Sequence, residues 1–167
     1  MDAGFIIEHL GLTPLPFEGG YFRETYRSGE TIARSCLPSR YRAEKRFSTA
    51  IYYLITPDTF SALHCVSSDE LFHFYLGDTV IMLQLCPDGT GKTVVLGHDL
   101  ERGQHPQCVV PGGTWQGLAL DAGGTFALMG TTVAPAFDPE DFVLGKRTTL
   151  IEHYPQFADM IMKLTRE

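Results

Sequence analysis

The chain has 167 residues, a hydrophobic fraction of 44% and a charged fraction of 20%, which is the profile of one ordinary globular domain. Its net charge of −7 argues against the basic surface that non-specific nucleic-acid binding needs, and the sequence has no apolar run of about 18 residues that would span a membrane. The four cysteines stand singly, as is typical of free thiols in a reducing compartment. We therefore expect one domain over residues 1–167, cytoplasmic, with no nucleic-acid partner and no membrane partner.

The first predicted element is a short amphipathic helix over residues 5–10, which Gly11 ends. A Gly-Gly turn then leads into an alternating strand, one face of which carries Tyr21, Arg23 and Thr25. Residues 30–46 are charged and predict a long loop of the kind that is often functional or mobile. We expect the basic residues of this loop, Lys45 among them, to be solvated.

From Phe47 onward, short β-branched and aromatic runs alternate with turns roughly every 8–12 residues, which is typical of an antiparallel sandwich or barrel. Asp88 and Gly89 form the strongest hairpin signal, because this pair supplies the positive φ angles of a tight turn. After Asp138 the hydrophobic period changes and predicts short helices, with Pro155 at the start of the last one. The expected fold class is all-β, with short helices at both ends of the chain.

The stretch FSALHCVSSDELFHFYLG, residues 60–77, holds the candidate chemistry. The spacing of His64, Glu70 and Gly77 resembles the first motif of the cupins, in which two histidines and a glutamate point into the barrel and bind a metal with a third histidine. Here Val66 stands at the second histidine position, and Gln116 stands where the second motif has its histidine. Because an amide is a poor ligand for a transition metal, we expect no metal and no cofactor.

The resemblance extends along most of the chain. EGGYFRETYRS, IYYLI, FSALHCVSSDELFHFYLGD, VVLGHDL, QCVVPGGTWQG and TVAPAFDPEDFVL follow one another in the order found in the cupin-5 group, formerly DUF985. Similarity to this group implies a cupin-type double-stranded β-helix, that is, a jelly-roll barrel, and it implies a homodimer. The reaction of the group is not established, and many cupins are not enzymes, so the resemblance leaves open whether the chain is an enzyme.

His64 and Glu70 are the candidate catalytic pair. A core histidine with a satisfied hydrogen bond is the structural alternative for His64, but the motif spacing favours a place in the pocket. A buried Glu70 needs a partner, and His64 or Arg23 are the candidates for it. His73 has the opposite strand parity, so we expect it to face away from the pocket.

The candidate ligand-binding residues share an expected position on the pocket side of a strand. For the stripe on the first long strand, exposure to solvent is the alternative, although its arginine is suited to clamp a carboxylate or a phosphate. The full set is Tyr21, Arg23, Thr25, Tyr53, Phe72, Phe74 and Gln116.

Two functions follow from these residues. The first is binding of a small molecule, sugar-like or bearing a carboxylate or phosphate, in the barrel interior. The alternative is a metal-free isomerase or epimerase of a carbohydrate, in which His64 is the acid or base, Glu70 orients it, and Tyr21 or Tyr53 returns the proton.

Overall fold

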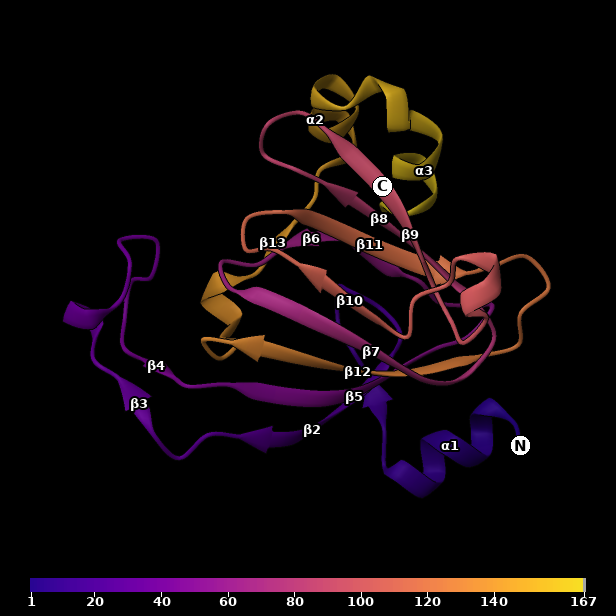
Figure 1. Ribbon diagram of the computed structural model, residues 1–167, viewed down its shortest axis with the longest axis horizontal. Coiled ribbons are helices and arrows are strands. Elements are labelled where there is room, and N and C mark those ends of the chain that lie inside the picture. The colour runs from indigo at the N-terminus through magenta and orange to yellow at the C-terminus, as the bar shows by residue number, and fades with distance from the viewer. Residues whose placement is uncertain (167) are drawn as a thin grey trace.

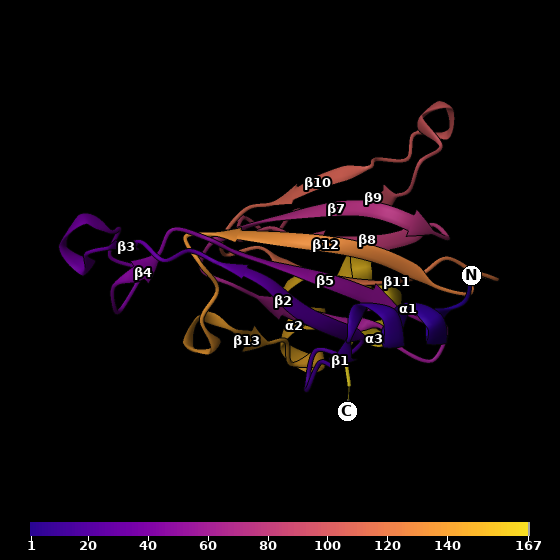
Figure 2. The same cartoon turned by 90° about the horizontal axis from the view of Figure 1, so that it is seen from below.

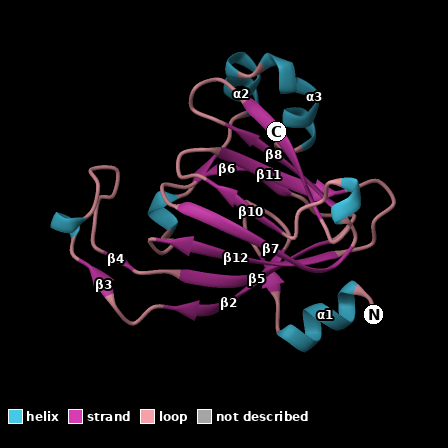
Figure 3. Cartoon of the chain, viewed as in Figure 1, coloured by secondary structure: helices cyan, strands magenta, loops and turns pink. Residues whose placement is uncertain are grey.

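Two antiparallel β-sheets form the body of the protein, and they face each other in a jelly roll with short helices near both ends of the chain (Figures 1 and 3). The computed structural model describes residues 1–166. The larger sheet has six strands, in the order β1 (Thr13–Pro14), β2 (Tyr21–Arg27), β5 (Thr49–Ile55), β12 (Ala127–Ala134), β7 (Asp69–Gly77) and β10 (Gln107–Val110). The smaller sheet has five, in the order β13 (Val143–Leu144), β6 (Ser61–Cys65), β11 (Trp115–Leu120), β8 (Val80–Leu85) and β9 (Gly91–Leu96). The expected all-β jelly-roll class is confirmed.

Strand alternation fills the space between the sheets. In β7, Glu70, Phe72 and Phe74 are buried, whereas His73 and Tyr75 are more exposed and lie on the outer face. The two phenylalanines join the main core, together with Tyr53, Ile55, Val80, Met82, Leu96, Leu118 and Met129. The prediction that His73 faces away from the interior is confirmed, and its Nε2 lies 3.3 Å from the hydroxyl of Thr132.

Helices cover the outer faces of both sheets. The helix α1 (Ala3–Leu10) begins two residues before the expected start and is capped there by Asp2, and Gly11, with φ of 61°, ends it as expected from the sequence. It packs on one end of the larger sheet, whereas α2 (Arg147–His153) and α3 (Ala158–Lys163) pack on the smaller one through a second apolar cluster (Figure 1). The short 3₁₀ turns are η1 (Arg34–Cys36), η2 (Leu100–Arg102), η3 (Pro139–Asp141) and η4 (Pro155–Phe157). No helix within residues 1–166 combines the length and apolarity needed to cross a membrane.

The expected long loop over residues 30–46 contains structure. It is an arm in which β3 (Thr31–Ile32) pairs with β4 (Lys45–Arg46), and it projects from the body of the protein (Figure 2). At its base, Lys45 is only 1% exposed, so the prediction that this lysine is solvated is wrong. Its burial follows from contacts with residues 138–141, described below with the site.

Candidate functional site

A cavity of about 80 Å³ lies between the two sheets. Its wall is mostly apolar, and five of its ten lining residues are Leu15, Phe22, Ile51, Val66 and Phe137. The other five, which carry polar side-chain atoms, are Glu18, Tyr53, His64, Glu70 and Thr131. The cavity therefore brings together His64, Glu70 and Tyr53 from the predicted set, and it adds a glutamate that the sequence analysis did not single out.

His64 lies on β6 and is almost fully buried. Its Nδ1 is 2.8 Å from the carbonyl oxygen of Ala62, and since a carbonyl can only accept, Nδ1 carries the proton in the neutral ring. Nε2 is therefore the acceptor of the ring, and the amide nitrogen of Gln116 donates to it at 3.3 Å. Phe142 stacks on the imidazole ring with the centroids 5.1 Å apart. The ring is thus fixed in orientation, with an acceptor atom beside the cavity.

Glu70 lies on β7, in the sheet opposite His64. Its Oε2 accepts a hydrogen bond of 2.6 Å from the side-chain amide of Gln116. Burial raises the pKa of Glu70, and although His64 lowers it, the net direction is upward, with Glu18 adding to the rise and hydrogen bonds from Thr131 and Gln116 opposing it. The partner of this carboxylate is therefore a neutral amide, and Arg23 does not take part.

Gln116 joins the two candidate catalytic residues. It lies on β11 in register with His64, and its nitrogen contacts both His64 and Glu70. Its Oε1 is buried and has no hydrogen-bond partner among residues 1–166. Such an orphaned acceptor is rare in a folded protein and calls for an explanation.

The residues present do not fit the four-ligand metal centre of the cupin motif. Val66 lines the cavity at the second histidine position and offers no donor atom. At the fourth position, the nitrogen of Gln116 faces Glu70, and an amide nitrogen does not bind a metal in this form. Within residues 1–166, no three His, Cys, Asp or Glu side chains are grouped to hold a metal ion.

Glu18 is the functional candidate that strand periodicity missed. Its Oε2 lies 4.0 Å from Nε2 of His64, and its Oε1 accepts a hydrogen bond of 2.9 Å from the hydroxyl of Ser61. The loop that presents it has positive φ at Phe17 (65°), Gly19 (105°) and Gly20 (74°). A bulky residue with positive φ is strained, and such strain concentrates at functional sites. The sequence feature that could have identified Glu18 is its position directly before the Gly19–Gly20 pair.

Long-range contacts hold this loop in place. Arg166 donates to the carbonyl oxygens of Phe17 and Glu18, each at 3.2 Å. From inside the barrel, the hydroxyl of Tyr53 donates to the carbonyl of Gly19 at 2.9 Å. Burial, followed by the charge of Glu18, raises the pKa of Tyr53 well above its usual range. Tyr53 is thus a neutral donor that fixes the glutamate loop.

The stripe Tyr21, Arg23 and Thr25 lies outside the cavity. Because Phe22 lines the cavity, its neighbours along β2 point to the outer face, which corrects the prediction that this stripe lines the pocket. Tyr21 packs against the cluster under α1, and the guanidinium of Arg23 lies 5.7 Å from the ring centre of Tyr52.

Thr25, Phe72 and Phe74, which were predicted to bind the ligand, also do not line the cavity. The register of β2 shifts between Glu24 and Tyr26, and the hydroxyl of Thr25, which lies at this irregularity, donates to the carbonyl of Ala50. Phe72 and Phe74 face inward as predicted, but they pack in the main core and do not line the cavity. Their parity was readable from the sequence, whereas their distance from the cavity was not.

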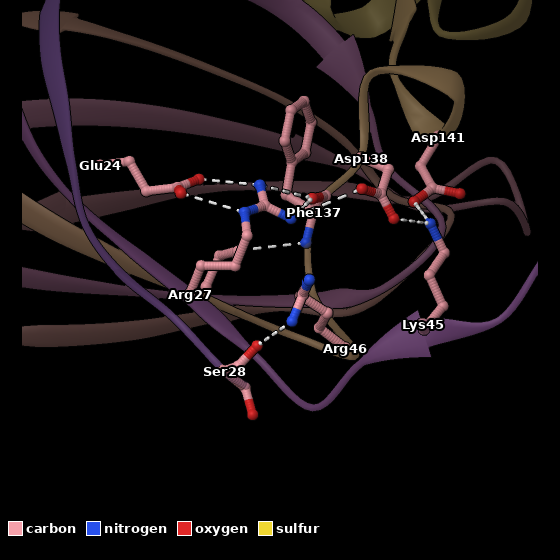
Figure 4. Close-up of polar contacts among 9 residues, drawn as sticks. Glu24, Arg27, Ser28, Lys45, Arg46, Phe137, Asp138 and Asp141 are labelled. Carbon is pink, nitrogen blue, oxygen red and sulfur yellow. Dashed lines mark hydrogen bonds and ion pairs between the residues drawn. The ribbon is translucent and has the colours of Figure 1, made fainter. Parts of the chain in front are cut away.

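A second polar cluster lies beside the cavity, with Lys45 and Asp141 buried and its other members partly exposed (Figure 4). Lys45 donates to Asp138 at 2.7 Å and also to Asp141, while Arg27 makes two hydrogen bonds with Glu24, at 2.8 and 3.0 Å. We call these five residues the anchoring cluster. Burial lowers the pKa of Lys45, but the hydrogen bonds to its two aspartates outweigh this effect and raise it overall.

The anchoring cluster positions residues 137–142 over the cavity. Arg27 also donates to the carbonyl of Phe137, whose own N–H donates to the hydroxyl of Thr49 (Figure 4). This segment places Phe137 in the cavity wall and Phe142 against His64. Asp138 and Asp141 therefore fix one side of the site.

Comparison with known proteins gives a consistent result. The family model described as Cupin superfamily (DUF985) matches residues 4–145. The Saccharomyces cerevisiae protein named Uncharacterized protein YML079W is 31% identical over 144 residues, which cover 81% of this chain and 72% of the yeast protein. A solved structure of a hypothetical protein from Leishmania major superposes with a TM-score of 0.89, 31% identity and full coverage of both chains.

A more distant likeness concerns the fold alone. The structure of oxalate decarboxylase from Bacillus subtilis at pH 4.6 superposes with a TM-score of 0.54 at 12% identity. The match covers 92% of this chain and 37% of that protein. At this identity the comparison supports the jelly-roll architecture and says nothing about activity.

Proposed function

The chain belongs to the DUF985 family of the cupin superfamily, and from this premise we propose that it binds a small molecule in the cavity between its two sheets. The observation that carries the proposal is the lining of the cavity, to which His64, Glu70 and Glu18 contribute while no lysine or arginine among residues 1–166 does. Buried polar groups are normally satisfied within the fold. A wall that keeps acceptors beside a cavity is therefore better explained by a ligand than by stability.

The size of the cavity limits the ligand. A site needs roughly 10–15 Å³ of such volume to hold one water molecule, so about 80 Å³ admits a group of a few non-hydrogen atoms. A whole sugar nucleotide would require residues 137–142 or the Glu18 loop to move. We infer that the cavity holds a small metabolite, or the small end of a larger one.

The arrangement favours binding over a carbohydrate isomerase. An isomerase of the proposed kind needs a second acid to return the proton on the opposite face. The hydroxyl of Tyr53 already donates to Gly19, and Tyr21 lies on the outer face of its sheet. Neither tyrosine is placed for that step, so binding is the function that the geometry supports best.

We also propose that the protein forms a homodimer. The outer face of the larger sheet carries exposed apolar side chains, including Tyr75 (45% exposed) and Val109 (47%) on the neighbouring strands β7 and β10. An edge strand with apolar side chains invites pairing with another chain. Light scattering should give twice the 18.5 kDa chain mass, and a monomer at all concentrations would contradict the proposal.

The proposed setting is a reducing compartment such as the cytoplasm. Its support is that Cys36, Cys65, Cys86 and Cys108 are all free thiols. Thiol titration of the protein taken directly from cells should find all four reactive after unfolding. A stable disulfide would contradict this setting.

Native mass spectrometry of the purified protein tests the binding proposal, together with a screen of small metabolites. The matched variants are His64→Asn, whose amide can still donate to Ala62 but lacks Nε2, and His73→Asn on the outer face. Binding should be lost in the first variant and kept in the second. If the ligand binds equally well to His64→Asn, or if no small molecule binds to the wild-type protein, the proposal is wrong.

A further inference from the structure

The polar atoms around the cavity include more hydrogen-bond acceptors than free donors, and this excess of acceptors indicates the chemistry of the ligand. The inferred chemistry rests on the proposed function, because it takes the cavity as the binding site. Each polar atom of the wall is either a donor or an acceptor at neutral pH, and each can be assigned from its contacts.

The remaining polar atoms of the wall are acceptors. Nε2 of His64 is an acceptor, because Nδ1 carries the proton toward Ala62, and the amide nitrogen of Gln116 donates to it at 3.3 Å. Oε2 of Glu18 lies 4.0 Å from that nitrogen, beyond hydrogen-bond distance, while the other oxygen is already occupied by Ser61. Gln116 contacts His64 and Glu70 without lining the cavity itself, and its buried Oε1 has no partner within residues 1–166.

The donors, in contrast, are already used. The hydroxyl of Tyr53 donates to the carbonyl of Gly19. The amide nitrogen of Gln116 donates to Glu70 and approaches His64. The polar wall therefore presents acceptors to the cavity.

The charged residues of the lining also favour a ligand that donates hydrogen bonds. No lysine or arginine among residues 1–166 lines the cavity, although two glutamates do. Cations on segments that adjoin the cavity have other partners: Lys45 pairs with Asp138 and Asp141, Arg27 with Glu24, and Arg166 with backbone carbonyls. A carboxylate or phosphate in the cavity would face two acids with no cation to receive it.

We propose that the cavity selects a small ligand that donates hydrogen bonds and carries positive charge, namely an organic ammonium group on a short alkyl chain. The ammonium lies between Glu18 and Glu70, within reach of Nε2 of His64. Its alkyl chain packs on the apolar part of the wall, against residues such as Phe22, Ile51 and Val66. The expectation of a carboxylate or phosphate ligand is thereby replaced.

The proposal makes binding depend on pH. The raised pKa of Glu70 reflects burial and the nearby charge of Glu18, and both effects are relieved when a cation enters. Affinity for the ammonium should therefore increase as the pH rises through the pKa of Glu70 and then level off. His64, Glu18 and Tyr53 are the other titratable groups that face this carboxylate.

Three probes of equal size and different charge test the proposal: propylammonium, 1-propanol and propanoate. Titrations near pH 8, where propylammonium is protonated, are followed by NMR through the amides of Val66 and Thr131 in the cavity wall. Propylammonium should bind about tenfold or more tightly than propanoate, with 1-propanol between them. Glu18→Gln and Glu70→Gln should each remove most of this preference, whereas the exposed Glu152→Gln should keep it.

The outcomes separate this inference from the proposed function. Equal or tighter binding of propanoate, no binding of propylammonium, or an undiminished preference in both cavity variants would each overturn the inference. A carboxylate or phosphate ligand that is found by native mass spectrometry and lost in His64→Asn would leave the proposed function standing while overturning the ammonium site. Binding of the ammonium that is insensitive to His64→Asn but lost in Glu18→Gln would support this inference alone.

Discussion

Two polar clusters meet at residues 137–142, and their carboxylates are paired in different ways. In the anchoring cluster, each carboxylate meets a cation: Asp138 and Asp141 meet Lys45, and Glu24 meets Arg27. In the cavity, Glu18 and Glu70 meet hydroxyls and an amide. The first group is paired within the fold, whereas no lysine or arginine among residues 1–166 lines the cavity beside the two glutamates.

This difference in pairing distinguishes carboxylates that stabilise the fold from carboxylates that suit a binding site. A buried charge is expensive unless it is paired, so a fold under selection for stability alone would neutralise or replace Glu70. Burial raises the pKa of Glu70, which is the direction expected for such a cost. Proteins commonly retain such unfavourable groups at binding and catalytic sites.

Removal of the cation from the anchoring cluster should have the largest effect. Lys45→Met leaves the nearly buried Asp141 without its partner, and breaking a buried pair in this way costs about 3 kcal/mol. Urea unfolding at neutral pH measures the loss, with the exposed Lys92→Met as the control. A loss below about 1 kcal/mol, as for a surface pair, would show that the cluster is not structural.

The loop that carries Glu18 should be the next most sensitive element. Gly19 has φ of 105°, and a Cβ atom there would collide with the carbonyl oxygen of Phe60. Gly19→Ala should therefore cost about 2 kcal/mol and weaken binding, since the loop must shift. At Gly123, where φ is 85° and the surrounding space is open, the same change should cost about 1 kcal/mol and leave binding intact. Equal effects at both glycines would argue against a tightly held loop.

Neutralisation of the cavity should act in the opposite direction. Because the pKa of Glu70 is raised in the folded state, the folded protein binds more protons than the unfolded chain, and wild-type stability falls as the pH rises from about 4.3 through the raised pKa. Glu70→Gln removes this fall, so at neutral pH it should be more stable by about 1 kcal/mol while losing ligand binding. Unfolding curves between about pH 4 and pH 8 measure the slope. A variant that is less stable than wild type across this range would contradict the account.

The strain at Phe17 should have the smallest effect. This side chain is 76% exposed and has φ of 65°, a conformation that glycine adopts freely. Phe17→Gly should therefore raise the free energy of unfolding by about 0.5 kcal/mol, whereas Phe47→Gly, at a partly exposed position without positive φ, should lower it. Thermal unfolding distinguishes the two signs.

The sequence predicts the parts of this site that depend on strand parity. His64 and Glu70 face inward and His73 outward because side chains alternate along β6 and β7, and the motif spacing identified Val66 and Gln116 as departures from a metal site. Most strands and helices also lie where the alternation, turns and proline signals place them.

The remaining features depend on contacts that local patterns do not encode. The burial of Lys45 depends on Asp138 and Asp141, which lie 93 and 96 residues further along the chain. Glu18 reaches the cavity because three residues around it have positive φ, and no alternation rule applies to such a loop. The outward direction of Arg23 follows from the register of β2 on β5, which the sequence left open between two faces.

A crystal structure of the protein with propylammonium near pH 8 tests the central claim most directly. The account predicts the ammonium nitrogen in the cavity, within about 3.2 Å of carboxylate oxygens of both Glu18 and Glu70, with Lys45 still bound to Asp138 and Asp141. Propylammonium on the aspartates of the anchoring cluster, or an anion in the cavity beside His64, would contradict it.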